Sequence, residues 1–172
     1  MRRRALFTAT AIVAVVTGLQ ACRTPTEAAT KLDQAQLCIE SDTGQKPVTA
    51  ELAVTDTQRS KGLMGRESLP PDHGMMFVYQ ASRPPEATFW MYRTFIPLDI
   101  AYISEAGEIR AIRKMLPCAA DDPDRCPQYP AGVTYTTALE MPQGFFRTNG
   151  IRVGHRVEVL DAPRAHCPQP DA

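Results

Sequence analysis

Apolar and polar residues alternate along residues 48–54, where Val48, Ala50 and Leu52 are separated by Thr49 and Glu51. A period of two is typical of a β-strand with one buried face. Short apolar runs between turn residues predict further strands over residues 36–40, 75–80, 88–91, 98–104, 109–115, 133–141 and 155–160. So many short strands predict a mainly β fold, either a small β-sandwich or a partly open barrel.

Two short helices are predicted among these strands. Thr55 and Gln58 have the spacing of a capping box, which predicts a helix that continues to about Leu63. Pro142 suits the first turn of a second helix that runs through Phe146. Neither helix is long, so the strands are expected to supply most of the core.

The chain begins with the features of a secretory signal peptide, predicted over residues 1–21. Arg2, Arg3 and Arg4 precede an apolar stretch too short to span a bilayer comfortably. The stretch ends in Leu-Gln-Ala-Cys, which resembles a bacterial lipobox and makes Cys22 the candidate lipidation site. Ordinary secretion, with Cys22 as a free thiol of the mature chain, is the alternative.

The remaining chain is expected to form one exported domain that faces the periplasm. Residues 22–35 are predicted to be a lipid anchor and tether, residues 36–162 the β domain, and residues 163–172 a flexible tail. The membrane is then a partner through the N-terminal lipid. Arg23, which follows the cysteine in place of an aspartate, favours the outer membrane if the organism has one.

Cysteine parity agrees with export. If Cys22 carries a lipid, four cysteines remain, an even number suited to an oxidising compartment. Three pairings are possible. Cys118 and Cys126 bracket a loop rich in proline and aspartate and are close enough to join locally, in which case Cys38 pairs with Cys167. The spacings suit no standard zinc site.

Charge argues against a nucleic-acid partner. The chain has 19 Lys and Arg against 19 Asp and Glu. Loss of Arg2, Arg3 and Arg4 leaves 19 − 3 = 16 basic groups, a net charge of about −3. No basic stripe is present either.

The segment TFWMYRTFIPLDIAYIS, residues 88–104, places two charged side chains in the most apolar part of the chain. Arg93 and Asp99 are six residues apart, with Pro97 between them, so the chain must turn or bulge there. One interpretation is an internal Arg93–Asp99 ion pair that holds the turn. The other is an arginine at the edge of an aromatic pocket, where it binds a carboxylate or a phosphate.

Three segments of the chain are distinctive: TDTQRSKGLMGRESLPPDHGMMFVY, FWMYRTFIPLDIAYIS and ALEMPQGFFRTNGIRVGHRVEV. Together they resemble the DUF192 family, also called UPF0127, a family of uncharacterised small proteins, and the resemblance extends over about residues 46–160. The family motifs fall on Arg59, Gly62, Leu63, Met64, Arg66, Gly74, Met75, Phe77, Phe89, Trp90, Met91, Thr94, Ile96, Pro97, Leu98, Asp99, Leu139, Glu140, Gly150, Ile151 and Gly154. The resemblance implies a small β-sandwich with short helices, and no established reaction, cofactor or partner.

The chain departs from the family pattern at two places. The family commonly has Lys-Asn before the motif threonine, where this chain has Tyr92 and Arg93. The family also has Gly-Asp near its end, where this chain has Gly154 and His155. The first departure argues against Arg93 as a functional group of the whole family.

The leading functional hypothesis is a non-catalytic binding or accessory module of the cell envelope, with an unknown envelope ligand or protein as its partner and no cofactor. Its predicted binding residues are a rim of polar groups around an aromatic pocket: Arg59, Arg66, Phe77, Trp90, Met91, Arg93 and Asp99.

Two alternatives remain open. A glycan-directed hydrolase would use Asp99 and Glu140 as a paired acid and base. Copper(I) binding would use thioether and imidazole ligands. The candidates are Met64, Met75, Met76, Met91 and His73, although methionine is also a routine filler of cores.

Overall fold

The computed structural model describes residues 31–160 and Cys167, which belong to a compact unit that begins at Lys31. The predicted signal peptide, Cys22 and nearly all of the predicted tail lie outside the described residues. Strand β1 begins at Gln34, two residues before the predicted start of the domain.

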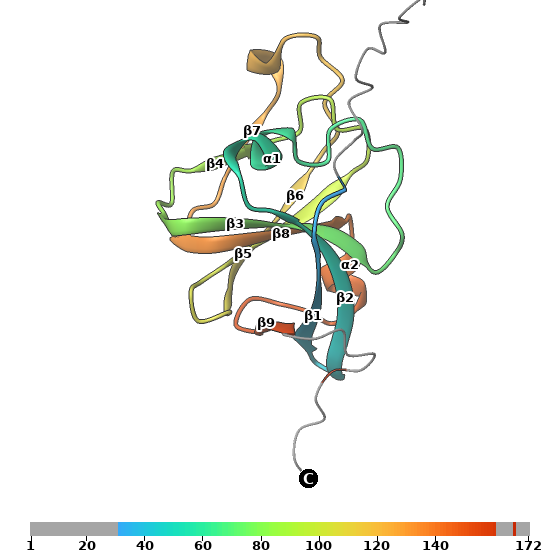
Figure 1. Ribbon diagram of the computed structural model, residues 1–172, viewed down its shortest axis with the longest axis vertical. Coiled ribbons are helices and arrows are strands. Elements are labelled where there is room, and N and C mark those ends of the chain that lie inside the picture. The colour runs from blue at the N-terminus through green and yellow to red at the C-terminus, as the bar shows by residue number, and fades with distance from the viewer. Residues whose placement is uncertain (1–30, 161–166, 168–172) are drawn as a thin grey trace, which may run out of the picture. The chain divides into compact units, whose positions relative to one another are not determined.

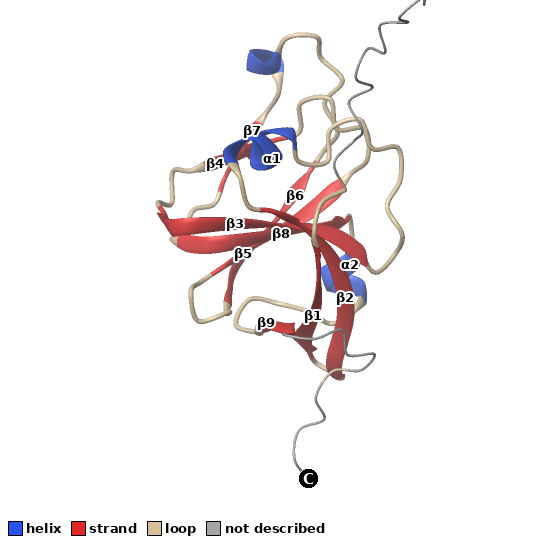
Figure 2. Cartoon of the chain, viewed as in Figure 1, coloured by secondary structure: helices blue, strands red, loops and turns tan. Residues whose placement is uncertain are grey.

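The fold is mainly β, as predicted (Figures 1 and 2). One sheet of the described chain contains seven strands in the order β6-β5-β8-β3-β2-β1-β9. Their bounds are β1 Gln34–Ser41, β2 Gly44–Ala53, β3 His73–Arg83, β5 Leu98–Ile103, β6 Ile109–Met115, β8 Tyr135–Pro142 and β9 Val157–Leu160. A second, two-stranded sheet joins β4 (Thr88–Trp90) to β7 (Gln128–Pro130).

The large sheet curls until its two edge strands approach each other. Backbone N–H groups of Ile109 and Val157 donate to the carbonyls of His155 and Gly107, both at 2.8 Å, and so link the start of β6 to the segment entering β9. Of the two predicted architectures, the partly open barrel describes this arrangement better.

Each face of the sheet has its own apolar core. The concave face contains side chains from both edges of the sheet, such as Leu37 of β1 and Ile109 of β6, together with Phe146 of helix α2 (Phe145–Thr148). The opposite face packs Met75, Ile100 and other residues beneath the β4–β7 ribbon and helix α1 (Asp56–Lys61). In Figure 1, α1 and the ribbon lie above β3, and α2 lies beside β2. Candidate chemistry therefore depends on which face a side chain occupies.

Helix α1 connects two parallel strands, β2 and β3. The predicted capping box is present, because the Thr55 side chain accepts from the Gln58 N–H and the Gln58 side chain accepts from the Thr55 N–H. The helix ends at Gly62, whose φ of +47° favours glycine. This crossover brings the end of α1 over the outer core.

Two predicted details are wrong. Pro142 is the last residue of β8 and does not open a helix, and α2 starts at Phe145 after Gly144 adopts a left-handed conformation. The proline-rich loop contains regular structure that the sequence did not indicate, namely β7 and a short 3₁₀ helix, η1 (Pro123–Arg125). Strand β7 has only three residues, too few for a period of two to be recognised.

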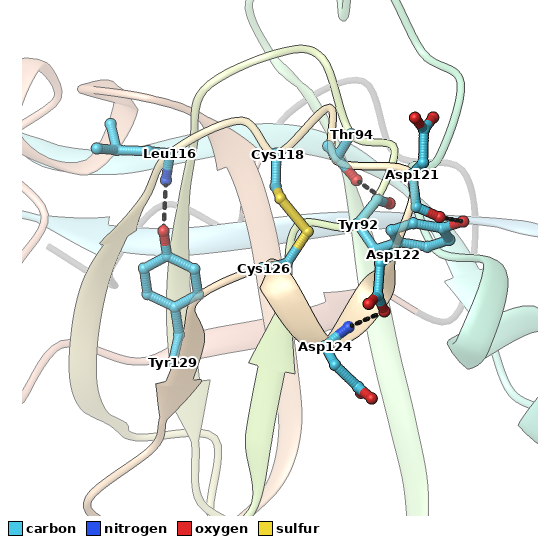
Figure 3. The surroundings of a disulfide bond; sticks show 9 residues. All are labelled: Tyr92, Thr94, Leu116, Cys118, Asp121, Asp122, Asp124, Cys126 and Tyr129. Atoms are coloured by element: carbon cyan, nitrogen blue, oxygen red, sulfur yellow. Dashed lines mark hydrogen bonds between the residues drawn. A yellow bond between two sulfur atoms is a disulfide. The ribbon is translucent and has the colours of Figure 1, made fainter.

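The four cysteines of the described residues form the disulfides expected if Cys118 and Cys126 join locally. Cys118 bonds to Cys126 and Cys38 bonds to Cys167. Figure 3 shows the first bond at the base of the η1 loop, where the Asp124 N–H donates to the Asp122 side chain at 3.0 Å. Two disulfides indicate an oxidising, non-cytoplasmic compartment and hence an exported protein.

Candidate functional site

The two acids proposed as a catalytic pair lie on opposite faces of the large sheet. Residues directly opposite in an antiparallel pair share a face, and β5 pairs Asp99 with Met141 but Ile100 with Glu140. Met141 belongs to the concave core and Ile100 to the outer core. The sheet therefore separates Asp99 from Glu140, and the predicted shared acid–base site is wrong.

Asp99 is a buried capping group beside α2. Its Oδ2 atom accepts from the backbone N–H of Gly144 at 2.8 Å, and within the described chain its Oδ1 atom has no hydrogen-bond partner. The predicted ion pair with Arg93 is therefore wrong. Arg93 is exposed, and its guanidinium lies 5.1 Å from the ring centroid of Tyr92.

The turn that contains Arg93 explains the unusual local sequence. Arg93 has a φ of +51°, and the Thr94 N–H donates to the Met91 carbonyl at 2.9 Å. Positive φ at the third position of such a turn favours glycine or asparagine. The asparagine that the family commonly has at this position is thus accounted for by the backbone.

Glu140 is a carboxyl group in an apolar environment. It lies opposite Met75 of β3 and Ile100 of β5, and only 4% of its surface is exposed. No hydrogen bond to its side chain is found in residues 31–160. Burial raises its pKa to about 8, so that the neutral acid predominates at pH 7.

The backbone of Glu140 is also closely packed. A Cβ atom at Gly74 would lie 2.1 Å from the Glu140 carbonyl oxygen and 2.4 Å from the Met141 sulfur. Both contacts are far too short, so β3 can approach β8 here only because residue 74 is glycine.

A narrow cavity of about 20 Å³ opens beside Glu140, with room for about one water molecule. Its lining residues come from the end of α1 and the segment that follows it, from β3 and β4, from the turn after β4, and from β8. They are Arg59, Ser60, Lys61, Gly62, Leu63, Met64, Phe77, Phe89, Trp90, Thr94 and Glu140. All of them except Ser60 and Lys61 stand at motif positions of the family resemblance. Nine of its 21 motif positions therefore line this one cavity.

A larger cleft of about 420 Å³ adjoins this cavity and shares Arg59, Ser60, Phe89 and Trp90 with it. Its walls are helix α1, the end of β3 and the whole of β4. The lining residues are Asp56, Arg59, Ser60, Tyr79, Gln80, Ala81, Ser82, Arg83, Thr88, Phe89 and Trp90. Trp90, the only tryptophan of the chain, is 38% exposed here.

The two arginines of the cleft differ in their availability. Arg59 is fully engaged, because it donates to the carbonyls of Val54 and Val78 at 2.7 Å and pairs with Asp56 at 2.5 Å. Arg83 is exposed, stacks 5.2 Å from the Tyr79 ring centroid, and has no acidic partner in the described part of the chain. Arg83 is therefore the cation that remains available to a ligand.

Tyrosines beneath Arg83 form the apolar floor of this region. Burial raises the pKa of Tyr79 well above its ordinary value and also raises the pKa of Tyr135, although the neighbouring Arg83 opposes both shifts. The two rings meet edge to face at 5.7 Å. Both tyrosines stay protonated at neutral pH and act as hydrogen-bonding or packing groups.

The remaining predicted rim residues do not gather at the cleft. Arg66 pairs with Glu51 at 2.6 Å, and Met91 is a core residue with 1% of its surface exposed. Of the seven predicted binding residues, Arg59, Phe77 and Trp90 line the two cavities. Sequence reasoning missed Arg83, although the polar run of residues 80–83 after an apolar strand was a usable signal.

Of the proposed copper ligands, the sheet separates Met76 from Met75 and Met91. Met75 packs in the outer core and Met76 in the concave core, while His73 is exposed at the start of β3. Across residues 31–160, no group of three or more His, Cys, Asp or Glu side chains is arranged to hold a metal ion. Among the described helices, none has the length and hydrophobicity required to cross a bilayer.

Comparison with known proteins agrees with the motif resemblance. A profile of the DUF192 family, described as "Uncharacterized ACR", matches residues 37–159. A search of curated proteins finds no match.

Several solved structures are similar to this chain, including two with 30% sequence identity. One, from Sinorhizobium meliloti 1021 and described as a "putative transcription regulator", has 30% identity and a TM-score of 0.66 over 75% of this chain and 95% of its own. The other, a protein of unknown function from Novosphingobium aromaticivorans DSM 12444, has 30% identity and a TM-score of 0.65 over 76% and 89%.

Proposed function

The chain belongs to the DUF192 family, and we propose that it is a lipid-anchored, non-catalytic binding module of the cell envelope. In this proposal Cys22 carries the lipid, and the cleft beside Trp90 holds a ligand with a carboxylate or phosphate group. The observation that carries it is Arg83, a cation without an acidic partner among the described residues, in a cleft of about 420 Å³.

The composition of the cleft supports binding of this kind. Pockets of about 300–1,000 Å³ commonly enclose small ligands, with aromatic walls and a few polar groups that fix orientation. Trp90 and Tyr79 provide the aromatic surfaces and Arg83 the charge. A guanidinium recognises a carboxylate or phosphate through two parallel hydrogen bonds.

The absence of turnover is supported by the separation of Asp99 from Glu140. General acid–base catalysis by two carboxyl groups requires both on one cleft. Of these two acids only Glu140 lies near the cleft, because it lines the narrow cavity that adjoins the cleft. As a predominantly neutral acid at pH 7, Glu140 is suited to donate a hydrogen bond to a water molecule or to a ligand oxygen.

Fluorescence of Trp90 tests binding directly, because the chain has no other tryptophan. Titration of the full mature protein with inorganic phosphate, succinate and glutamate should change the emission and reach saturation. Arg83→Gln should weaken binding about ten- to hundredfold, the value of a hydrogen bond to a charged group. Arg110→Gln, an exposed arginine outside the cleft, serves as the matched control.

Unchanged emission with every probe, confirmed by calorimetry, would exclude an anion site at the cleft. The anchor is tested separately by labelling cells with a palmitate analogue. Labelling of the wild-type chain and its loss in Cys22→Ala are expected. An unlabelled wild-type protein that is released as a soluble chain would contradict lipidation and favour ordinary secretion.

A further inference from the structure

Two strand edges face the large cleft. Strand β3 pairs with β2 only as far as Phe77, although β3 itself continues to Arg83. On the other side of the cleft, β4 pairs with β7, and no second ladder partner of β4 occurs in the described residues. Both strands therefore present backbone that no neighbouring strand of the described chain covers.

The boundary of the uncovered edge lies at Val78. Its carbonyl accepts from Arg59 Nη1 at 2.7 Å, so the arginine side chain occupies the place that β2 leaves. Beyond Val78 the register between β3 and β8 shifts, so that residues 79–82 of β3 are unpaired, and the ladder resumes only at Arg83. Gln80, Ala81 and Ser82 are all exposed within this segment and line the cleft.

We propose that the ligand of the cleft is an extended peptide segment with an acidic side chain or terminal carboxylate, which adds as a strand to the edge of β3 at residues 79–82. The inference rests on the proposed binding function and names the ligand class of that same site. An extended peptide satisfies exposed strand N–H and C=O groups, which is why sheet edges recur as peptide sites.

The dimensions of the cleft fit a short segment. Five residues of β3 (79–83), of which residues 79–82 form the uncovered edge, and the three residues of β4 form its long walls. A segment of three to four residues extends about 10–14 Å at roughly 3.3 Å per residue, the length of the facing strands. Side chains of such a segment alternate in direction, so one set faces Tyr79 and Trp90 while the other faces solvent.

The charges that line the cleft favour a peptide with an acidic group. Asp56 is the only acidic residue that lines the cleft in the described chain, and it is already paired with Arg59. Arg83 stands at the end of the uncovered edge, where a strand lying along residues 79–82 would terminate. A carboxylate at the end of the peptide therefore meets the available guanidinium.

A positional-scanning library of acetylated pentapeptides that end in aspartate provides the probe. Trp90 emission and calorimetry with the full mature protein identify the pool that binds best. Its members are then N-methylated one position at a time, while succinate and inorganic phosphate serve as free anions. Strand addition predicts that methylation at alternate positions weakens binding tenfold or more, and that the positions between them tolerate it.

Substitutions in the protein test the same strand pairing as N-methylation of the peptide. Gln80→Pro and Ala81→Pro each remove one backbone N–H of the uncovered edge, and at least one of the two should abolish peptide binding. Arg83→Gln should weaken the aspartate-ended peptides at least tenfold and Arg110→Gln should not. Because the N-methyl scan alters only the peptide, it decides the question even if a proline variant fails to fold.

The outcomes separate this inference from the function on which it rests. An alternating effect of N-methylation supports strand addition. Binding of free anions alone, or peptide binding that is insensitive to N-methylation at every position, overturns the peptide inference and leaves the proposed binding function intact. If neither peptides nor anions bind, both are wrong.

Discussion

At the scale of single residues, the pKa of Glu140 is determined by the face of the sheet on which its side chain lies. Its neighbours Met75 and Ile100 are apolar, and burial raises its pKa from 4.5 to about 8. Between these values the folded state binds a proton that the unfolded state has released. The free energy of unfolding therefore falls as the pH rises from about 5 to about 8, by up to roughly 1.4 kcal/mol per pH unit.

Glu140→Gln should remove this contribution, because an amide does not titrate. Urea unfolding at pH 5, 6, 7 and 8 should show the variant gaining stability relative to wild type as the pH increases. Glu105→Gln, an exposed acid on a turn, should keep the wild-type slope. Parallel curves for wild type and Glu140→Gln would show that Glu140 is not the buried titrating group.

Arg93 is a residue whose backbone conformation matters more than its charge. Its φ of +51° strains most side chains, and β-branched ones most of all. Arg93→Asn should be more stable than Arg93→Val by about 1–2 kcal/mol, because both lose the contact with Tyr92 and only asparagine tolerates this conformation. Thermal unfolding measures the difference.

The same pair of substitutions at Arg110, an exposed position in β6, is the control. There the strand favours valine, so the order should reverse. An Arg93→Val variant as stable as Arg93→Asn would contradict the positive φ at this turn.

The partners of Asp99 were predicted wrongly from the sequence, because they depend on how the strands pair in the sheet. Arg93 and Asp99 are close in sequence, and the segment between them suggested an ion pair. Alternation already places Asp99 on the face of Ala101, opposite to Leu98 and Ile100. Which face approaches Glu140 depends on the pairing of β5 with β8, about 40 residues apart, and no local pattern specifies it.

At the scale of elements, α1 positions Gly62 and Leu63 at the cavity, and its capping box fixes where it begins. Thr55→Ala removes the side-chain acceptor of the Gln58 N–H and should lower the free energy of unfolding by about 1 kcal/mol. Urea unfolding measures this loss. Thr57→Ala, an exposed change inside the same helix, should be neutral or slightly stabilising. Equal losses in the two variants would contradict the cap.

Elements with strong local signals were predicted well. The capping box located α1, and the run from Ile109 to Met115 gave the bounds of β6. The parallel pairing of β2 with β3 was not predicted, because a short helix between two strands is also compatible with an antiparallel arrangement. Helix α2 was misplaced because Pro142 suits both a helix start and a strand end, and the pairing of β8 with β5 decides between them.

At the scale of the whole molecule, the two disulfides close loops of very different length. Cys38 and Cys167 are 129 residues apart and join β1 to the end of the chain, whereas Cys118 and Cys126 are 8 apart. Both lie among buried residues, so the loss of packing should be similar in the two cases. The difference between them then reports the entropy of loop closure in the unfolded chain.

Paired serine substitutions measure this difference. Chain entropy predicts that removal of Cys38–Cys167 lowers the free energy of unfolding by about 5 kcal/mol and removal of Cys118–Cys126 by about 2.5 kcal/mol. Since small domains have roughly 5–15 kcal/mol of stability, the first variant should unfold at much lower urea concentration. Because Cys118–Cys126 packs in the outer core near the cleft, its loss should also alter the environment of Trp90, which emission of the folded variant reports. A larger loss of stability from the short loop than from the long one would mean that packing around Cys118 and Cys126, rather than chain entropy, determines how the disulfides stabilise this domain.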